Sequence, residues 1–276
     1  MRAGPQVLRS IESMRSFGAG GPLGFVPTMG FLHEGHLSLL RRAREECASV
    51  VMSVFVNPLQ FGPTEDLERY PRDEVRDLEL AREIGVDAVF VPSAEEMYPE
   101  GSVTEVRVKD VGDVLEGAAR PGHFIGVATV LAKLLNIVRP ERMYLGQKDA
   151  QQAVVVRRMI EDLNFPTRLV VCPTIREPDG LAMSSRNVYL NPEERAAATL
   201  LYEGLSAARE SGDRDPERLE AGVREVVARE PLIELEYVSA DDAGVLGPVT
   251  PETQEILLSL AARLGKTRLI DNVVIR

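Results

Sequence analysis

The stretch Pro22–Val56, "PLGFVPTMGFLHEGHLSLLRRAREECASVVMSVFV", decides the fold of this chain. Its short apolar start, Leu23–Val26, predicts a strand. Apolar residues then recur at helical spacing between Leu37 and Cys47, which predicts a helix. Ser49–Val56 is a continuous, largely apolar run of the kind found in a parallel strand that is covered on both faces. Together the three segments predict a βαβ unit.

The same alternation continues downstream. The pattern predicts helices near Arg72–Ile84, His123–Val138 and Asp149–Leu163, and strands at Asp87–Val91, Arg142–Leu145 and Arg168–Cys172. Such alternation indicates an α/β fold with a doubly wound, Rossmann-like parallel sheet and right-handed crossovers. Ligands of these sheets bind at the carboxyl ends of the strands. The loops that follow Val26, Val56, Leu145 and Cys172 are therefore the ones to examine for function.

The pattern changes after the segment "EPDGLAMSSRNVYL". Helices are expected near Glu193–Ser211 and Pro216–Glu230, followed by an alternating strand, "LIELEYVSADD". The final segment, "EILLSLAARLGKTRLIDNVVIR", fits a helix and a strand, but two antiparallel strands are favoured. We therefore expect two domains, a Rossmann-like domain over residues 1–174 and a smaller α+β domain over residues 175–276.

Composition narrows the class of protein. The net charge of −11, from 43 acidic and 32 basic side chains, argues against a nucleic-acid partner and requires a local positive cluster for any anionic ligand. No apolar run approaches the ~18 residues of a membrane span, and "MRAGPQ" lacks a signal-peptide pattern. Cys47 and Cys172 are too few for a disulfide framework and are expected to be buried thiols. A cytoplasmic protein is expected.

Two of the three histidines, His33 and His36, lie in the first strand-to-helix loop. Gly30 and Gly35 permit close backbone approach there, and the start of the helix favours phosphate. On spacing alone, metal ligation or helix capping is as probable as nucleotide catalysis. No cysteine or third histidine lies nearby in the sequence, which disfavours a metal site.

Two later segments carry groups suited to phosphate. "MSSR", Met183–Arg186, places two hydroxyls beside a guanidinium, although alone it reads as a polar loop. "YLGQKDAQQ", Tyr144–Gln152, has Gly146 at the turn and Lys148 at a helix start, where a cation opposes the helix dipole. Binding of a phosphate or carboxylate would explain that lysine.

Amides and further cations complete the set of candidates. Asn57 and Gln60, in "FVNPLQF", offer rigid donors and acceptors for a small polar acid. "ARPGHF" adds Arg120 and His123.

These motifs, in this order, resemble the pantothenate synthetase (pantoate–β-alanine ligase) family of the HxGH nucleotidyltransferase superfamily, which is related to class I aminoacyl-tRNA synthetases. The resemblance extends from about Pro22 to the closing "TRLIDN" and rests on Pro27–His36, "FVNPLQF", "RPGHF", "KDAQQ" and "DGLAMSSRNVYL". It implies ATP-dependent condensation of (R)-pantoate with β-alanine through a pantoyl adenylate, with release of AMP and diphosphate. Mg²⁺ as cofactor, with ligands left open, and a homodimer are implied as well; no nucleic-acid or membrane partner is expected.

The resemblance also implies roles for single residues. His36 is implied as the catalytic proton donor, and Gln60 and Gln152 as pantoate ligands, with Gln60 also contacting β-alanine. Residues 1–174 would bind ATP and pantoate, and residues 175–276 would close over the active site. The implied ATP-binding residues are Met29, Gly30, Phe31, Leu32, His33, Glu34, Gly35, His36, Gly146, Gln147, Lys148, Asp149, Ile175, Met183, Ser184, Ser185 and Arg186.

One departure and two alternatives remain. The family usually has Glu where this chain has Gln147, so a role that needs negative charge there is in doubt.

A loop near Gly62–Tyr70 is expected to act as a lid. A nucleotidyltransferase that moves AMP onto a phosphorylated acceptor would share the same motifs. A tRNA-binding relative or nucleotide sensor is disfavoured by the acidic C-terminal region and by Gln60 and Gln152, which a sensor would not need.

Overall fold

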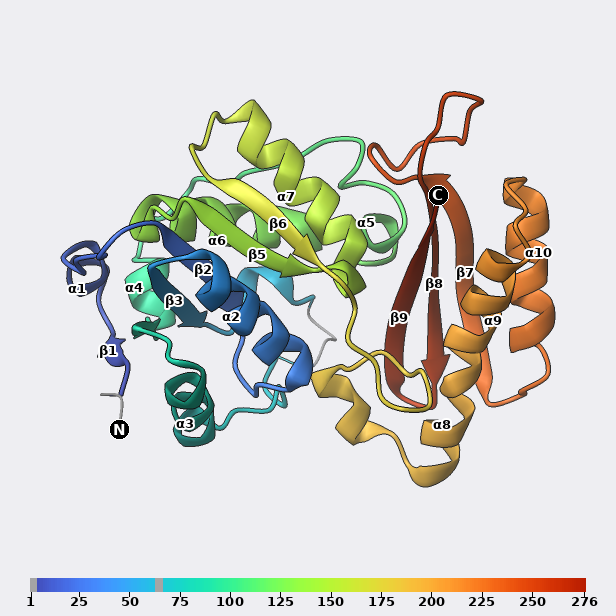
Figure 1. Ribbon diagram of the computed structural model, residues 1–276, viewed down its shortest axis with the longest axis horizontal. Helices are drawn as coiled ribbons and strands as arrows, with labels where there is room; N and C mark the ends of the chain where they lie inside the picture. Colours follow the sequence, from blue (N-terminus) through green and yellow to red (C-terminus); the bar gives the residue numbers. More distant parts are fainter. Residues whose placement is uncertain (1–3, 63–66) are drawn as a thin grey trace. The chain divides into compact units, whose positions relative to one another are not determined.

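The computed structural model describes residues 4–62 and 67–276, which form two compact units (Figure 1). Unit 1 comprises the chain up to Gly146 together with Val155–Cys172. Unit 2 comprises Gln147–Val154 and Pro173–Arg276. No helix within these described ranges is long and apolar enough to cross a membrane.

A six-stranded parallel sheet organises unit 1. Its strands are β1 (Gln6–Leu8), β2 (Leu23–Thr28), β3 (Ser49–Val54), β4 (Ala88–Phe90), β5 (Arg142–Gly146) and β6 (Arg168–Cys172), in the spatial order β1-β4-β3-β2-β5-β6. The chain progresses from β2 outward in one direction and then returns to build β5 and β6 on the other side of β2. The predicted doubly wound fold is confirmed. Its topological switch point lies between the carboxyl ends of β2 and β5, where such sheets bind ligands.

Helices cover both faces of this sheet. On one face pack α2 (Glu34–Glu46) and α3 (Glu74–Ile84); the other carries α1 (Ile11–Arg15), α6 (His123–Val138) and the later turns of α7 (Ala150–Asp162). Side chains of consecutive strand residues pack into the apolar cores on opposite faces of the sheet, as those of Phe25 and Val26 do. Alternation of side chains across a strand that is buried on both faces explains the largely apolar runs in the sequence. Three short elements connect the larger ones: η1 (Pro58–Gln60), α4 (Ala94–Met97) and α5 (Glu116–Ala119).

Unit 2 is built on a three-stranded antiparallel sheet. Its strands β7 (Ile233–Asp242), β8 (Ile256–Leu264) and β9 (Thr267–Ile275) lie in sequence order. The helices α9 (Thr199–Glu210) and α10 (Pro216–Val227) pack on this sheet around one apolar core. The unit also holds η2 (Gln147–Asp149), η3 (Ser185–Tyr189) and α8 (Pro192–Ala197). Two antiparallel strands at the C-terminal end, the favoured prediction, are confirmed.

Most boundaries differ from the predicted ones by only a few residues, and the larger differences have local causes. The helical region predicted over Glu193–Ser211 is divided into α8 and α9. At the division the Thr199 hydroxyl donates to the carbonyl of Ala196 (2.8 Å), a side-chain bond that competes with the helical ladder. Cys47 follows the end of α2, and both cysteines are buried, unpaired thiols, as predicted.

Candidate active site

The loop between β2 and α2 begins with a position that only glycine fits. Gly30 has φ +85°, and a Cβ there would lie 2.9 Å from Val54 Cγ1 and 3.0 Å from Asp77 Oδ2. The amide of Gly30 donates to Thr28 Oγ1 (3.1 Å), whose hydroxyl donates to the carbonyl of Ser53 (2.7 Å). The loop is thus fixed to the carboxyl ends of β2 and β3.

A buried carboxylate on α3 holds the next two residues of this loop. Asp77, 1% exposed, accepts from the amides of Phe31 and Leu32, each at 2.8 Å. Its neighbour Arg76 donates to the carbonyl of Leu32 (2.9 Å). Burial raises the pKa of Asp77 above its usual value, and the hydrogen bonds from the two backbone amides oppose that shift. Helix α3 therefore fixes the backbone immediately before His33.

His33 and His36 form a reciprocal cap at the start of α2. His33 Nδ1 accepts from the amide of Gly35 (3.2 Å), and His36 Nδ1 accepts from the amide of His33 (3.3 Å). Their ring centroids lie 4.1 Å apart. Because each Nδ1 accepts, the neutral form of each ring carries its proton on Nε2. The helix-capping interpretation is confirmed, and capping orients both rings at a helix terminus that favours anions.

Gln60 ends η1 at the carboxyl side of β3 and is held by a buried amide. Asn57, 1% exposed, donates from Nδ2 to the carbonyl of Gly126 (3.1 Å) and to Gln60 Oε1 (3.2 Å). Asn57 Oδ1 accepts from the Tyr98 hydroxyl (2.8 Å). Gln60 Nε2 lies 2.9 Å from Met29 Sδ, so unit 1 brings the predicted amide against the predicted nucleotide loop.

Arg120 and His123 hold the backbone of Gln60. The carbonyl of Gln60 lies 2.8 Å from His123 Nδ1 and 3.4 Å from Arg120 Nη2. Arg120 Nη1 lies 3.1 Å from His123 Nε2. Since a guanidinium only donates, Nε2 is the acceptor and Nδ1 carries the proton that bonds Gln60. This cation and imidazole hold the backbone carbonyl of Gln60 in place.

In unit 2, the residues after β5 form η2 and the start of α7. Asn272 on β9 accepts from Gln147 Nε2 at Oδ1 (3.1 Å) and donates to the carbonyls of Gln147 (3.0 Å) and Lys148 (2.9 Å). Lys148 Nζ lies 3.3 Å from Asp149 Oδ1, and the Lys148 side chain is 21% exposed. Gln152 is the third residue of α7 and is half-buried.

The second predicted nucleotide segment of unit 2 is a narrow hairpin that leads into η3. The amide of Met183 donates to the carbonyl of Ile175 (3.0 Å), and an antiparallel bridge joins Arg176 to Ala182. Ser184 caps η3 by accepting from the amide of Arg186 (3.3 Å). The hairpin therefore places Ile175 beside Met183 and delivers Ser184–Arg186 at its end.

The predicted ATP-binding residues are divided between the two units. Met29–His36 and Gly146 belong to unit 1, whereas Gln147–Asp149, Ile175 and Met183–Arg186 belong to unit 2. Residues 63–66 of the expected lid lie outside the described residues. Sequence reasoning gave no role to Asp77, Asp271 or Asn272. The closing "TRLIDN" contains the last two and was the one available signal.

The family model for pantoate-beta-alanine ligase matches residues 5–274. The chain is 57% identical to the pantothenate synthetase of Chloroflexus aggregans over 272 residues, covering 97% of this chain and 98% of that protein. It is 55% identical to that of Heliobacterium modesticaldum over 279 residues, covering 97% and 99%.

Solved structures agree with this relationship. The pantothenate synthetase of Thermus thermophilus is 47% identical, with a TM-score of 0.93 and coverage of 97% of this chain and 98% of that one. The pantoate-beta-alanine ligase of Francisella tularensis, crystallised with beta-gamma ATP and beta-alanine, is 34% identical, with a TM-score of 0.81 and coverage of 98% and 97%. The similarity to these proteins spans nearly the whole chain.

Proposed function

Because this chain belongs to the pantoate-beta-alanine ligase family, it is an ATP-dependent ligase that condenses pantoate with β-alanine, and we propose that it does so in two steps on the residues described above. In the first step a carboxylate oxygen of (R)-pantoate attacks the α-phosphorus of ATP and diphosphate leaves. In the second, the amine of β-alanine attacks the acyl carbon of the pantoyl adenylate and AMP leaves. The observation that carries this assignment is the pair of oriented imidazoles at the start of α2.

His36 is the proton donor in this proposal. An Nδ1 that is occupied by a backbone amide leaves Nε2 to carry the proton toward a phosphate oxygen as negative charge develops. His33 and the loop Met29–Gly35 contact the phosphates at the start of α2, where the helix dipole favours anions. The clamp from Asp77 supports this role, since it fixes the loop before any ligand arrives.

Gln60 and Gln152 bind pantoate in the proposal, and Gln60 also contacts β-alanine. Support for Gln60 comes from the bonds that orient its side chain and its carbonyl, through Asn57 and His123. An amide whose oxygen is held by Asn57 suits recognition of a small hydroxy acid, because a buried polar group left without its partner costs about 1–3 kcal/mol.

Unit 2 supplies positive charge and the adenine contact. Lys148 and Arg186 act on the phosphates that leave as diphosphate, with Ser184 and Ser185 as hydroxyl donors and Ile175 against the base. A chain with a net charge of −11 gives ATP no long-range attraction, so these few cations carry the charge complementarity. Gly146, Gln147, Asp149 and Met183 complete the proposed nucleotide site.

Mg²⁺ is proposed to enter with ATP. Within the described ranges no cluster of three or more His, Cys, Asp or Glu side chains is placed to hold a metal ion. This fits an ion that is held mainly by phosphate oxygens and water, to which Asp149 would supply a single carboxylate. When bound, the ion neutralises charge on the leaving diphosphate.

Assembly and location are also proposals. A homodimer follows from the family resemblance and is tested by light scattering after size-exclusion chromatography. A cytoplasmic location is supported by the two buried free thiols, Cys47 and Cys172, and by the need for ATP.

The reaction is tested by measuring AMP release with ATP, pantoate and β-alanine, leaving out each substrate in turn. AMP and pantothenate should form only when all three are present, and diphosphate should form without β-alanine. A dinucleotide product with a phosphorylated acceptor would instead identify an AMP transferase and contradict the proposal.

A further inference from the structure

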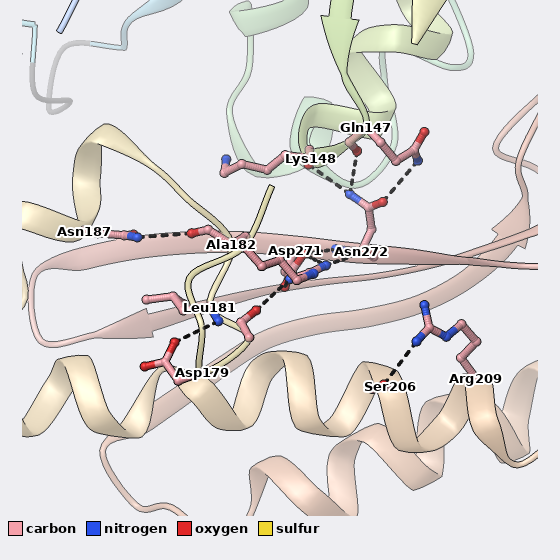
Figure 2. Close-up of polar contacts among 12 residues, drawn as sticks. Gln147, Lys148, Asp179, Leu181, Ala182, Asn187, Ser206, Arg209, Asp271 and Asn272 are labelled. Carbon is pink, nitrogen blue, oxygen red and sulfur yellow. Dashed lines mark hydrogen bonds and ion pairs between the residues drawn. The ribbon is translucent and has the colours of Figure 1, made fainter. Parts of the chain in front are cut away.

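Two buried polar residues on the last strand of unit 2 hold both segments that this unit contributes to ATP binding. Asp271 and Asn272, 3% and 4% exposed, are neighbours on β9. Figure 2 shows the Asn272 side chain directed at the Gln147–Lys148 segment, with Asp271 beside it on β9. Each contact lies within unit 2.

The side-chain amide of Asn272 forms hydrogen bonds with the backbone of η2. Its Nδ2 donates to two successive carbonyls, those of Gln147 (3.0 Å) and Lys148 (2.9 Å), and its Oδ1 accepts from Gln147 Nε2 (3.1 Å). Three bonds on one side chain fix the direction in which Lys148 leaves the backbone. The side-chain amide of Gln147 thus helps to hold η2 against β9. The family resemblance led us to expect a carboxylate at this position.

The carboxylate of Asp271 fixes the hairpin through Arg176. The guanidinium donates to both carboxylate oxygens, at 2.6 and 2.9 Å, and also to the carbonyls of Gly180 (3.1 Å) and Asn272 (3.2 Å). It lies 3.7 Å from the centre of the Tyr202 ring. A bidentate ion pair that also stacks on an aromatic face allows one orientation only.

Gly180 shows how closely this hairpin is packed. It has φ +96°, and a Cβ there would lie 2.6 Å from Tyr202 Cδ1. The turn of the hairpin is therefore pressed against the ring on which Arg176 stacks. From this turn the chain runs directly to Met183–Arg186.

We propose that Asp271 and Asn272 are positioning residues for adenylate formation, because together they set Lys148 and the Met183–Arg186 segment in place for the triphosphate. The inference rests on the proposed function of those two segments. It assigns to β9 a role in the first half-reaction only, since the diphosphate has left before β-alanine reacts.

Two near-isosteric variants of the full-length enzyme test the proposal. Asn272→Asp replaces the donor by an oxygen that faces two carbonyls, and Asp271→Asn removes one oxygen of the bidentate pair. For each, kcat/KM for ATP is measured in diphosphate release, and the rate of preformed pantoyl adenylate with β-alanine is measured separately. We expect kcat/KM for ATP to fall about 5- to 150-fold while the second rate is unchanged. If Asp271→Asn does not fold, Arg176→Lys breaks the same bidentate bond with the charge kept.

Val238→Ala is the matched structural control. Val238 lies on β7 in the apolar core of unit 2 and is 4% exposed. This variant should therefore lower the melting temperature and leave kcat/KM for ATP unchanged. The double variant Lys148→Ala/Asn272→Asp should lose less than the sum of the two single losses.

Equal losses in both half-reactions, or a loss of the same size in Val238→Ala, would show that β9 has only a structural role. Strictly additive losses in the double variant would overturn the link to Lys148. A wild-type enzyme that makes no pantothenate would instead refute the proposed function.

Discussion

Replacing Gly126 by alanine should lower kcat/KM for pantoate far more than kcat/KM for ATP. Gly126 lies on α6, where η1 crosses the helix, and an added Cβ would overlap the Leu59 carbonyl and lie 2.6 Å from Gln60 N. The nearest atom, the Leu59 carbonyl oxygen, would lie 2.2 Å from this Cβ, and ordinary contact begins near 3.4 Å, so η1 would have to move by about 1.2 Å. A misplacement of about 1 Å costs on the order of 100-fold in rate. Since η1 carries Gln60, we expect a loss of that order in kcat/KM for pantoate.

The same substitution elsewhere provides the control. Gly222 lies in α10, and an added Cβ there would meet nothing within 4 Å. Gly222→Ala should therefore raise the free energy of unfolding by about 0.5–1 kcal/mol through helix propensity and leave the kinetics unchanged. Gly126→Ala should lower that free energy by about 1–3 kcal/mol through overpacking. Initial rates at varied pantoate with saturating ATP, and the reverse, separate the two effects. A folded Gly126→Ala enzyme with unchanged kcat/KM for pantoate would refute the placement of Gln60 against this substrate.

Three further predictions concern the other parts of the site. His36→Ala should slow adenylate formation by about 10²–10⁴ with the fold retained, and near-normal diphosphate release would remove His36 from the mechanism. Asp77→Asn should lower the free energy of unfolding by about 1–3 kcal/mol, because one loop amide loses its acceptor. Burial raises the pKa of Asp77, so the folded state holds the proton more tightly than the unfolded chain. The wild type should therefore exceed this variant in free energy of unfolding by most below about pH 4, and the difference should shrink as pH rises through the raised pKa of Asp77. Denaturant titrations at several pH values would measure this difference. Lys148→Ala and Arg186→Ala should each reduce adenylate formation strongly, and their double variant should lose less than the sum, whereas additive losses would mean that the two cations act on separate groups.

The parallel sheet was predictable because its physical cause is local. A strand that is buried on both faces is largely apolar, and Ser49–Val54 reads that way, with Ser49 and Ser53 as its only polar residues. Strand β1 lacks this signal, since Gln6 and Val7 are exposed and only three residues pair with β4. The histidine pair could be found for a similar reason, since a cap is made by residues three positions apart.

The supports of the site could not be predicted in this way. Asp77 bonds the amide of Phe31, 46 positions earlier, and in sequence it reads as one more charge on a solvated helix face. Asn272 lies 125 positions from Gln147, so only the folded chain brings the two amides together. Local periodicity encodes which face of an element is buried, but it does not encode which polar group on a distant element that face will meet.

The position of β2 in the sheet affects how the chain is made. One side of β2 pairs with β3, which follows at once, but the other pairs with β5. The amide of Leu23 donates to Glu141 Oε2 (2.7 Å), a residue that the ribosome adds 118 positions later. At about 5–20 residues per second, β2 spends roughly 6 to 24 seconds with that edge open. During this interval the nascent chain can pair with another copy through the open edge, so a chaperone that shields apolar strands should raise the yield of folded enzyme.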